Sequence, residues 1–242
     1  MNIHDDSIDI FVLGLDDFNR NMLEAVDIGS QINFYPLLDM EAVTSSENYD
    51  VHATLDAAES QLRAYHRPLG GIIGYWDFPV SLMVPILAER LGLTAPSVKS
   101  VVGCEHKYWS RLLQKKAAPD HVPSFQSVDP FDDQALNEIQ IAYPYWIKPV
   151  KSHSSNLGFR IRNRRDLKKA IKEIRSGIAE IGNAFNEFMN YADLPEEVAR
   201  IGGNHCVVEG LIQGRQCTLE GFVHNGRIQV YGVVDSFRYP NG

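Results

Sequence analysis

Residues 145–161 read YWIKPVKSHSSNLGFRI: an apolar run that contains Lys148, then a small and polar segment (151–158), then apolar residues again. Alternation along a strand puts Lys148 on the same face as Trp146 and Val150, where a half-buried lysine needs an anionic partner. A phosphate is a natural counter-charge, and residues 151–158 supply hydroxyls and backbone amides that can fold over phosphates as a lid. The alternative, an ordinary lysine at a strand end followed by a surface turn, is slightly favoured by the spacing alone.

Upstream of this stretch, three apolar strand-like runs alternate with three helical patterns. The runs span 9–15, 32–38 and 70–76, and the helical patterns span 16–26, 50–65 and 80–92. The alternation predicts a parallel sheet covered on both faces, so residues 1–95 are interpreted as a small doubly wound α/β domain. Phe18, Met22 and Val26 share one face of the first helix. Gly14 is followed by Leu-Asp-Asp rather than by a G-x-G-x-x-G fingerprint, which argues against binding of NAD or FAD.

Downstream of residue 96 helical patterns come first. Two helices lead to a proline-marked exit, a short helix covers 129–139, and a long amphipathic helix covers 165–190. Gly177 and Gly182 predict a break or bend in that long helix, since glycine is unfavourable in a helix interior.

Three strands are predicted near the C-terminal end, at 205–212, 216–223 and 227–235. Asn225-Gly226 between the last two is a strong signal for a two-residue hairpin turn. Counted back from that turn, Thr218 lies opposite Val233 and Gln216 opposite Asp235.

Composition excludes several classes of partner. The formal net charge of −8 gives no attraction toward nucleic acid or an anionic membrane. The eight Lys and Arg residues from Arg160 to Arg175 are interpreted as a solvated helix face, because no aromatic platform accompanies them. The three cysteines fit reduced thiols, and the acidic start MNIHDDSIDI is unlike a signal peptide. A cytoplasmic protein is therefore expected.

Four segments, taken together, resemble the ATP-grasp superfamily of ATP-dependent carboxylate ligases. They are CEHKYWSRLLQKKAAPDHVPSF (104–125), YPYWIKPVKSHSSNLGFRI (143–161), HCVVEGLIQGRQCTLEGFV (205–223) and GRIQVYGVVD (226–235). No single motif is specific, but their order and separations both fit. The likeness covers residues 97–235, and the family commonly carries an N-terminal α/β domain such as the one predicted for 1–95.

The resemblance implies a nucleotide site for ATP. Lys107 and Lys148 would contact the phosphates, with Lys148 also near the adenine. The loop over the triphosphate would contain Ser152, His153, Ser154, Ser155 and Gly158. The adenine hinge would be Glu209, Gly210, Leu211 and Ile212, whose strand is expected to offer an edge backbone. Gln216 stands where the family usually has a ribose-binding glutamate, and Gly210 where Glu or Lys is common. Both are departures, and an amide at Gln216 would bind ribose without charge assistance.

The resemblance also implies a division of the chain. Residues 1–95 would be the N-terminal domain, 96–144 linker helices and the start of the ATP-grasp region, and 145–212 its small lid subdomain. Residues 213–242 would begin an incomplete C-terminal subdomain, so the chain is expected to be the N-terminal two thirds of a ligase. In the family a further segment supplies an arginine and an E-x-N pair that holds magnesium. No residue of this chain is therefore assigned to catalysis or to a metal, and alone it is expected to be inactive.

For a complete protein of this kind, the resemblance implies activation of a carboxylate as an acyl phosphate and attack by an amine or a thiol. Tyr75, Trp76 and Asp77 end the third strand, where an open sheet binds its ligands, and are candidates to contact that small carboxylate substrate. A helix N-cap at Asp77 is an equally good interpretation. Two other functions stay open: a non-catalytic nucleotide-binding or interaction module, and a plain α/β protein that binds a small ligand. Homodimer formation is also left open.

Overall fold

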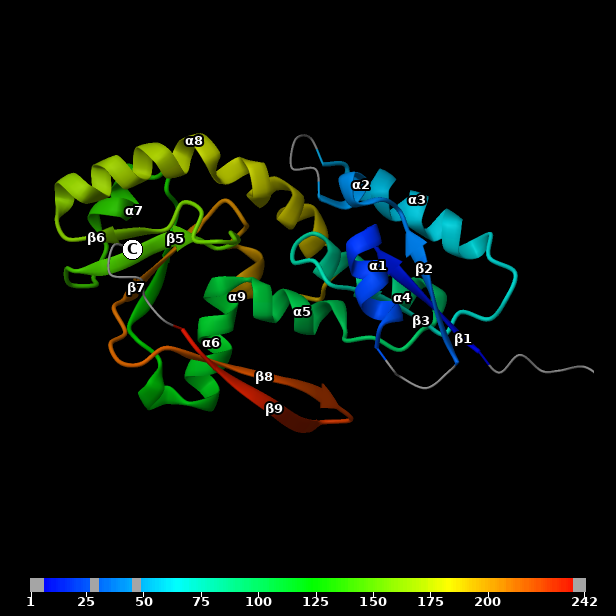
Figure 1. The fold of residues 1–242 in the computed structure, drawn as a ribbon. Coiled ribbons are helices and arrows are strands. Elements are labelled where there is room, and N and C mark those ends of the chain that lie inside the picture. Colours follow the sequence, from blue (N-terminus) through cyan, green and yellow to red (C-terminus); the bar gives the residue numbers. More distant parts are fainter. Residues whose placement is uncertain (1–6, 27–30, 45–48, 237–242) are drawn as a thin grey trace, which may run out of the picture. The chain divides into compact units, whose positions relative to one another are not determined.

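The computed structural model describes residues 7–26, 31–44 and 49–236, in a mixed α/β architecture (Figure 1). The chain divides into two compact units, residues 1–210 and residues 211–242. Within the described ranges, no helix combines the length and the apolar composition that a membrane span requires.

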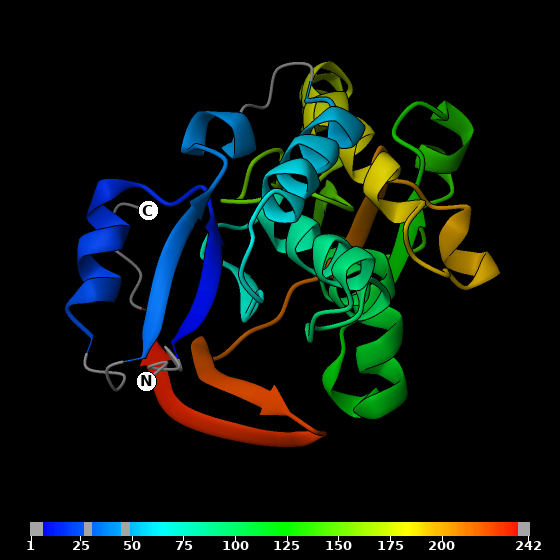
Figure 2. The ribbon, with the colours of Figure 1, turned by 90° about the vertical axis from the view of Figure 1, so that its right-hand side faces the viewer.

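The first unit begins with a three-stranded parallel sheet. Its strands are β1 (Ile8–Leu13), β2 (Ile32–Leu37) and β3 (Gly71–Gly74), in the order β2-β1-β3. They alternate with α1 (Asp17–Glu24), α2 (Met40–Thr44), α3 (Val51–Arg63) and α4 (Val80–Leu91). Figure 2 shows α1 on one side of the strands and α3 and α4 on the other. Leu13, Leu37 and Leu55 are fully buried in the core that results, and the predicted parallel pairing is confirmed.

Helix α1 differs from the other helices of this domain because it buries no residue. The Asp16 carboxylate caps it by accepting from the Asn19 amide at 2.7 Å, as the N-cap preference leads one to expect. Phe18, Met22 and Val26 are nevertheless exposed. Phe18 and Met22 do lie on α1, whereas Val26 lies beyond the end of the helix at Glu24, and the spacing carried no information on what covers these side chains.

A four-stranded antiparallel sheet is the second sheet of the first unit. Its strands are β4 (Phe125–Val128), β5 (Tyr145–Pro149), β6 (Phe159–Ile161) and β7 (Cys206–Gly210), in the order β4-β7-β5-β6. Around it lie α5 (Val98–Glu105), α6 (Lys107–Ala117), the 3₁₀ turn η1 (Pro119–His121), α7 (Asp133–Asn137), α8 (Arg164–Met189) and α9 (Glu196–Ala199). Strand β4 was not predicted, because the four-residue segment FQSV is too short and too polar to show a strand pattern.

One face of this sheet packs against α8. Tyr145 and Ile147 of β5 join Ile171 and Ile174 of α8 in a common apolar cluster. Alternation along β5 directs Trp146 and Lys148 to the opposite face, as predicted. Val150 was predicted to share the face of Trp146 and Lys148. It lies one residue beyond the end of β5 and is fully buried.

The prediction for the long helix was a break or a bend, and the break is wrong, since α8 is continuous from Arg164 to Met189. Its two glycines permit close contacts instead. A Cβ on Gly177 would lie 3.3 Å from a methyl of Leu157, and a Cβ on Gly182 would lie 3.0 Å from the backbone of Gly203. The two glycines therefore allow neighbouring segments to pack closely on the helix, and they do not mark its end.

The second unit contains a two-stranded antiparallel hairpin of β8 (Cys217–His224) and β9 (Arg227–Asp235). Asn225 and Gly226 both have positive φ, 48° and 74°, as a type I′ turn requires, and His224 pairs with Arg227.

The predicted register farther along this hairpin is wrong. Thr218 pairs with Val234 rather than Val233, and Asp235 lies opposite Cys217 rather than Gln216. A bulge at Glu220/Gly221 shifts the pairing by one residue. A Cβ on Gly221 would overlap the carbonyl oxygen of Gln229, so only glycine allows this close approach.

Candidate functional site

The polar face of the antiparallel sheet carries a buried carboxylate between two cations. Glu209 of β7 is only 6% exposed, and it pairs with Trp146 of β5, so its side chain shares a face with that of Lys148. The Lys148 ammonium donates to Glu209 Oε1 at 2.5 Å. The Arg111 guanidinium, on α6, donates to Glu209 Oε2 at 2.9 Å.

The charge state of Glu209 follows from these contacts. Burial alone would raise the pKa of its carboxyl group, but the hydrogen bond and charge of Lys148, followed by those of Arg111, outweigh burial and lower it. The ionised carboxylate therefore holds both cations in place. With two positive groups and one negative group, the cluster has an excess positive charge. Arg111 was not singled out from the sequence, although it lies one helical turn after Lys107, on the same helix.

Lys107, a further cation, lies at the start of α6. The Lys107 ammonium donates to the carbonyl oxygen of Ser152 at 2.6 Å, and its backbone amide donates to the carbonyl of Val150 at 3.1 Å. Burial, and then the charges of Lys151 and Lys148, lower the pKa of Lys107 to about 8. The carboxylates of Asp77 and Glu105 oppose this shift but do not cancel it. Lys107 is thus an ammonium group whose hydrogen-bond partner is neutral and whose surroundings disfavour its charge, which is an environment that favours an added anion.

Lys151 is the third lysine, and no sequence pattern singled it out. It is 4% exposed, and its ammonium lies 2.7 Å from Glu105 Oε2, 3.6 Å from Asp77 Oδ1 and 4.9 Å from the ring centre of Phe78. Asp77 and Phe78 belong to the β3–α4 connection, so Lys151 joins the N-terminal sheet to the segment after β5. Helix α4 has no side-chain N-cap, so the N-cap interpretation of Asp77 is wrong.

The predicted loop is an exposed turn directly beside these lysines. Ser154 and Ser155 adopt left-handed backbone conformations with φ of 49° and 59°, which are uncommon for residues other than glycine. The amide of Gly158 donates to the carbonyl of Ser155 at 3.1 Å and that of Asn156 to His153 at 2.8 Å. Of the predicted loop residues, Ser152 contacts Lys107, which is itself a predicted ligand of the phosphates.

The predicted hinge falls at the boundary of the two units. The edge-strand expectation is wrong for Glu209 and Gly210, because β7 lies between β4 and β5 in the sheet. The Gly210 amide donates to the carbonyl of Ser124 at 2.9 Å. Leu211, Ile212 and Gln216 belong to the second unit. The first unit therefore brings together Lys107, Lys148, Ser152 and Glu209 of the predicted residues and adds Arg111 and Lys151, which were not predicted.

No metal-binding group of three or more His, Cys, Asp or Glu side chains occurs in the described part of the chain. A cavity of about 470 Å³ does occur, between α7 and α8, and it contains none of the predicted site residues.

No family model and no curated protein sequence matches the chain. Solved structures do resemble it. An L-amino acid ligase from Bacillus licheniformis is 16% identical, with a TM-score of 0.65, and the match covers 96% of this chain and 54% of the ligase. D-alanyl-alanine synthetase A from Vibrio cholerae is 11% identical, with a TM-score of 0.62, and the match covers 98% of this chain and 70% of the synthetase.

An ADP complex of N5-carboxyaminoimidazole ribonucleotide synthetase is 13% identical, with a TM-score of 0.61, and the match covers 97% of this chain and 55% of the enzyme. These proteins are ATP-grasp ligases. The chain thus has the fold of ATP-grasp ligases, and the resemblance recognised in the sequence is confirmed at the level of the fold. It spans only 54% of the L-amino acid ligase and 70% of the Vibrio cholerae synthetase.

Proposed function

We propose that this chain is the ATP-binding portion of a ligase that activates a carboxylate as an acyl phosphate. In the full reaction, ATP would transfer its terminal phosphoryl group to the carboxylate, and an amine or thiol would displace phosphate from the product. The fold of carboxylate–amine ligases supports the class of reaction. The role of the residues below is argued from their contacts.

The observation that carries the proposal is the convergence of three ammonium groups at the start of α6. Lys107, Lys148 and Lys151 lie close enough for the charges of the last two to lower the pKa of the first. Carboxylates neutralise two of them, since Lys148 contacts Glu209 and Lys151 contacts Glu105. Lys107 contacts only a carbonyl oxygen. A triphosphate would supply the missing negative charge, and an ammonium group is a common phosphate ligand.

The loop after Lys151 is proposed to cover the phosphates, with Ser152, His153, Ser154, Ser155 and Gly158 as its contact residues. Its left-handed residues and its exposure are typical of a segment shaped for a ligand rather than for the core. Gly210, Leu211 and Ile212 are proposed to hydrogen-bond the adenine with their backbone, and Gln216 to bind the ribose. These four assignments rest on the resemblance.

The carboxylate substrate is proposed to bind at the ends of β1 and β3. There the Tyr75 hydroxyl donates to the carbonyl of Gly14 at 2.6 Å, and Asp77 approaches the ammonium of Lys151. Lys151 would thereby connect the substrate end of the parallel sheet to the nucleotide. If the Asp77→Ala variant of a complete ligase bound its carboxylate substrate with unchanged affinity, this part of the proposal would be wrong.

Calorimetric titration with ATP tests the nucleotide site directly. The chain is expected to bind ATP, and Lys107→Ala is expected to weaken binding by about tenfold, the effect of losing one hydrogen bond to a charged group. Lys148→Ala should weaken it as well. Lys116→Ala is the matched control, because Lys116 lies on the same helix, near its C-terminal end, and is exposed. Absence of binding at millimolar ATP would contradict the proposal and favour a plain α/β ligand-binding protein.

The same protein sample can be used to test whether ATP binding depends on magnesium and whether the chain self-associates. Because the proposed phosphate contacts are ammonium groups, removal of magnesium with a chelator is expected to leave most of the ATP affinity of this chain. A strong dependence on magnesium would show that a metal site has been missed. Light scattering distinguishes a monomer from the homodimer that the sequence leaves open.

A further inference from the structure

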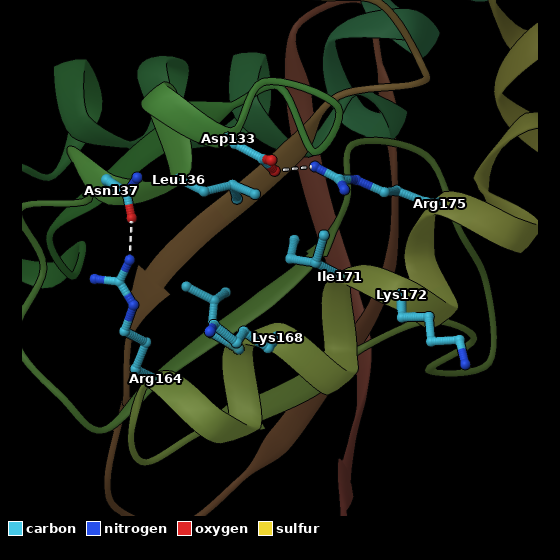
Figure 3. A pocket seen from close by; sticks show the side chains of 9 residues that line it. Asp133, Leu136, Asn137, Arg164, Lys168, Ile171, Lys172 and Arg175 are labelled. Atoms are coloured by element: carbon cyan, nitrogen blue, oxygen red, sulfur yellow. Dashed lines mark hydrogen bonds and ion pairs between the residues drawn. The ribbon is translucent and has the colours of Figure 1, made fainter.

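The antiparallel sheet has a second polar feature, on the face opposite the lysine cluster. Helices α7 and α8 pack on that face and line a solvent-open cavity of about 470 Å³, a size typical of small-molecule sites (Figure 3). Leu136, Leu167 and Ile171 give it an apolar surface. None of the residues assigned to the nucleotide lines it, and Lys148 and Glu209 point to the other side of the sheet.

The two ends of the cavity are closed by contacts between the helices. At one end the Arg164 guanidinium donates to the side-chain oxygen of Asn137 at 2.6 Å. At the other end Arg175 donates to Asp133 Oδ1 at 2.5 Å and to the carbonyl of Pro130 at 2.6 Å. Figure 3 shows both contacts, with Leu136 and Ile171 between them. These contacts join α7 to α8 at both ends of the cavity, although the Arg175 and Asp133 side chains are partly and largely exposed.

The wall formed by α8 is positively charged. Arg164, Lys168, Lys172 and Arg175 follow one another at intervals of four, four and three residues, which places them on one face of the helix. Asp133 is the one carboxylate among the residues that line the cavity. Lys168 makes no ion pair or hydrogen bond with the described residues. This stripe accounts for half of the basic cluster that the sequence suggested was merely solvated.

We propose that this cavity binds an organic anion that has an apolar or aromatic body and one carboxylate, phosphate or sulfonate group. The apolar body would lie on Leu136 and Ile171, and the anionic group would contact Lys168. Inorganic phosphate alone would leave the apolar surface uncovered, and an uncharged apolar molecule would gain no attraction from Lys168, whose ammonium group is exposed. The site is independent of the nucleotide site, and its ligand is independent of the proposed ligase activity.

The test uses anilinonaphthalene sulfonate as the probe, because it joins an aromatic body to one sulfonate. Binding is followed by NMR of isoleucine methyl groups in the full chain, with the Ile171 signal assigned from its loss in Ile171→Val. The probe is expected to shift the Ile171 signal in a saturable way. A titration in which Ile171 does not shift would overturn the proposal, even if the dye binds to other apolar surfaces.

A pair of charge reversals separates the site from the general charge of α8. Lys168→Glu is expected to raise the dissociation constant about fivefold, because it replaces an attractive charge with a repulsive one. Lys169→Glu makes the same change in charge at the next exposed residue, which does not line the cavity, and should leave the constant within about twofold. Equal effects of the two variants would overturn the proposal. Unchanged signals from isoleucines outside the cavity verify that each variant is folded.

Two competitors test the two halves of the predicted ligand. The uncharged analogue phenylnaphthylamine is expected to bind more weakly than the sulfonate, and the difference should shrink in Lys168→Glu. Inorganic sulfate is expected to displace the dye poorly. If the neutral analogue bound as tightly as the sulfonate, the charge would be irrelevant. If sulfate displaced the dye at equal concentration, the cavity would be a simple anion site, and the proposal would be wrong.

Discussion

ATP affinity is expected to fall as pH rises from 7.5 to 9, through loss of the proton on Lys107. Burial and the neighbouring Lys151 and Lys148 lower the pKa of this ammonium group to about 8 in the free protein, from 10.5 for an unperturbed lysine. The neutral amine cannot balance a phosphate charge. Binding therefore selects the protonated form, and the observed dissociation constant rises as that form becomes scarce.

The magnitude follows from the fraction of Lys107 that is protonated. With a pKa near 8, that fraction is about three quarters at pH 7.5 and about one tenth at pH 9. If only the protonated form binds, affinity falls about eightfold over this range. The terminal phosphate of the nucleotide does not contribute, because its second ionisation, with a pKa of about 6, is nearly complete at pH 7.5.

The stability of the free protein should change in the opposite direction. Between about pH 8 and 10.5 the unfolded chain keeps the proton on Lys107 and the folded chain has lost it, so the unfolded state binds more protons. The free energy of unfolding that this group contributes therefore rises with pH across that window. As pH rises, deprotonation of Lys107 is therefore expected to weaken ATP binding and to raise the free energy of unfolding.

The assay is calorimetric titration with ATP at four pH values between 7.5 and 9. In Lys107→Arg the side chain stays charged throughout, so its affinity should be nearly independent of pH even if it is weaker overall. Lys116→Arg is the control and should keep the decline of the unmodified protein. A decline of equal size in Lys107→Arg would refute the assignment of the effect to this residue.

Three further outcomes follow from the described contacts. Glu209→Gln should destabilise the fold by about 3 kcal/mol in denaturant unfolding, because it removes the charge that holds two cations together; a loss below about 1 kcal/mol would show that solvent screens the cluster. Gly182→Ala should lower stability by about 1–3 kcal/mol, because its Cβ would meet backbone at 3.0 Å, whereas Gly177→Ala should be neutral or stabilising. A thiol reagent should modify Cys104 and Cys217 in the folded protein and leave the buried Cys206 unmodified until denaturant is added.

Local patterns predicted the elements well where one rule decided the outcome. Periodicity of two in β5 placed Lys148 opposite the buried Ile147, and Asn225-Gly226 fixed the turn of the hairpin. The prediction failed where a distant contact decided. Gly182 accommodates the backbone of Gly203, and no local rule distinguishes a glycine that breaks a helix from one that accommodates a neighbour. The bulge at Gly221 likewise changes the register without any change in the alternation pattern.

The candidate site was predictable only as far as the resemblance reached. The positions of Lys107 and Lys148 follow from family motifs, and the structure places their charges close together. Arg111 and Lys151 were missed for a physical reason: each has its role through a partner far away in the sequence. Arg111 contacts Glu209, 98 residues later, and Lys151 contacts Glu105, 46 residues earlier (151 − 105). Ion pairs between distant segments leave no periodic pattern in the sequence.

The contacts also rank the lysines of the proposed nucleotide site. Lys148, which the sequence emphasises, is already neutralised by Glu209, so a phosphate must share or displace that carboxylate before it gains the charge. Lys107 contacts only the Ser152 carbonyl, and an anion there relieves the repulsion from its two neighbours. The larger loss of ATP affinity is therefore expected from Lys107→Ala. The proposed role of Lys148 is then chiefly to hold Glu209, and through it Arg111, beside the phosphates, in a network formed before the nucleotide arrives.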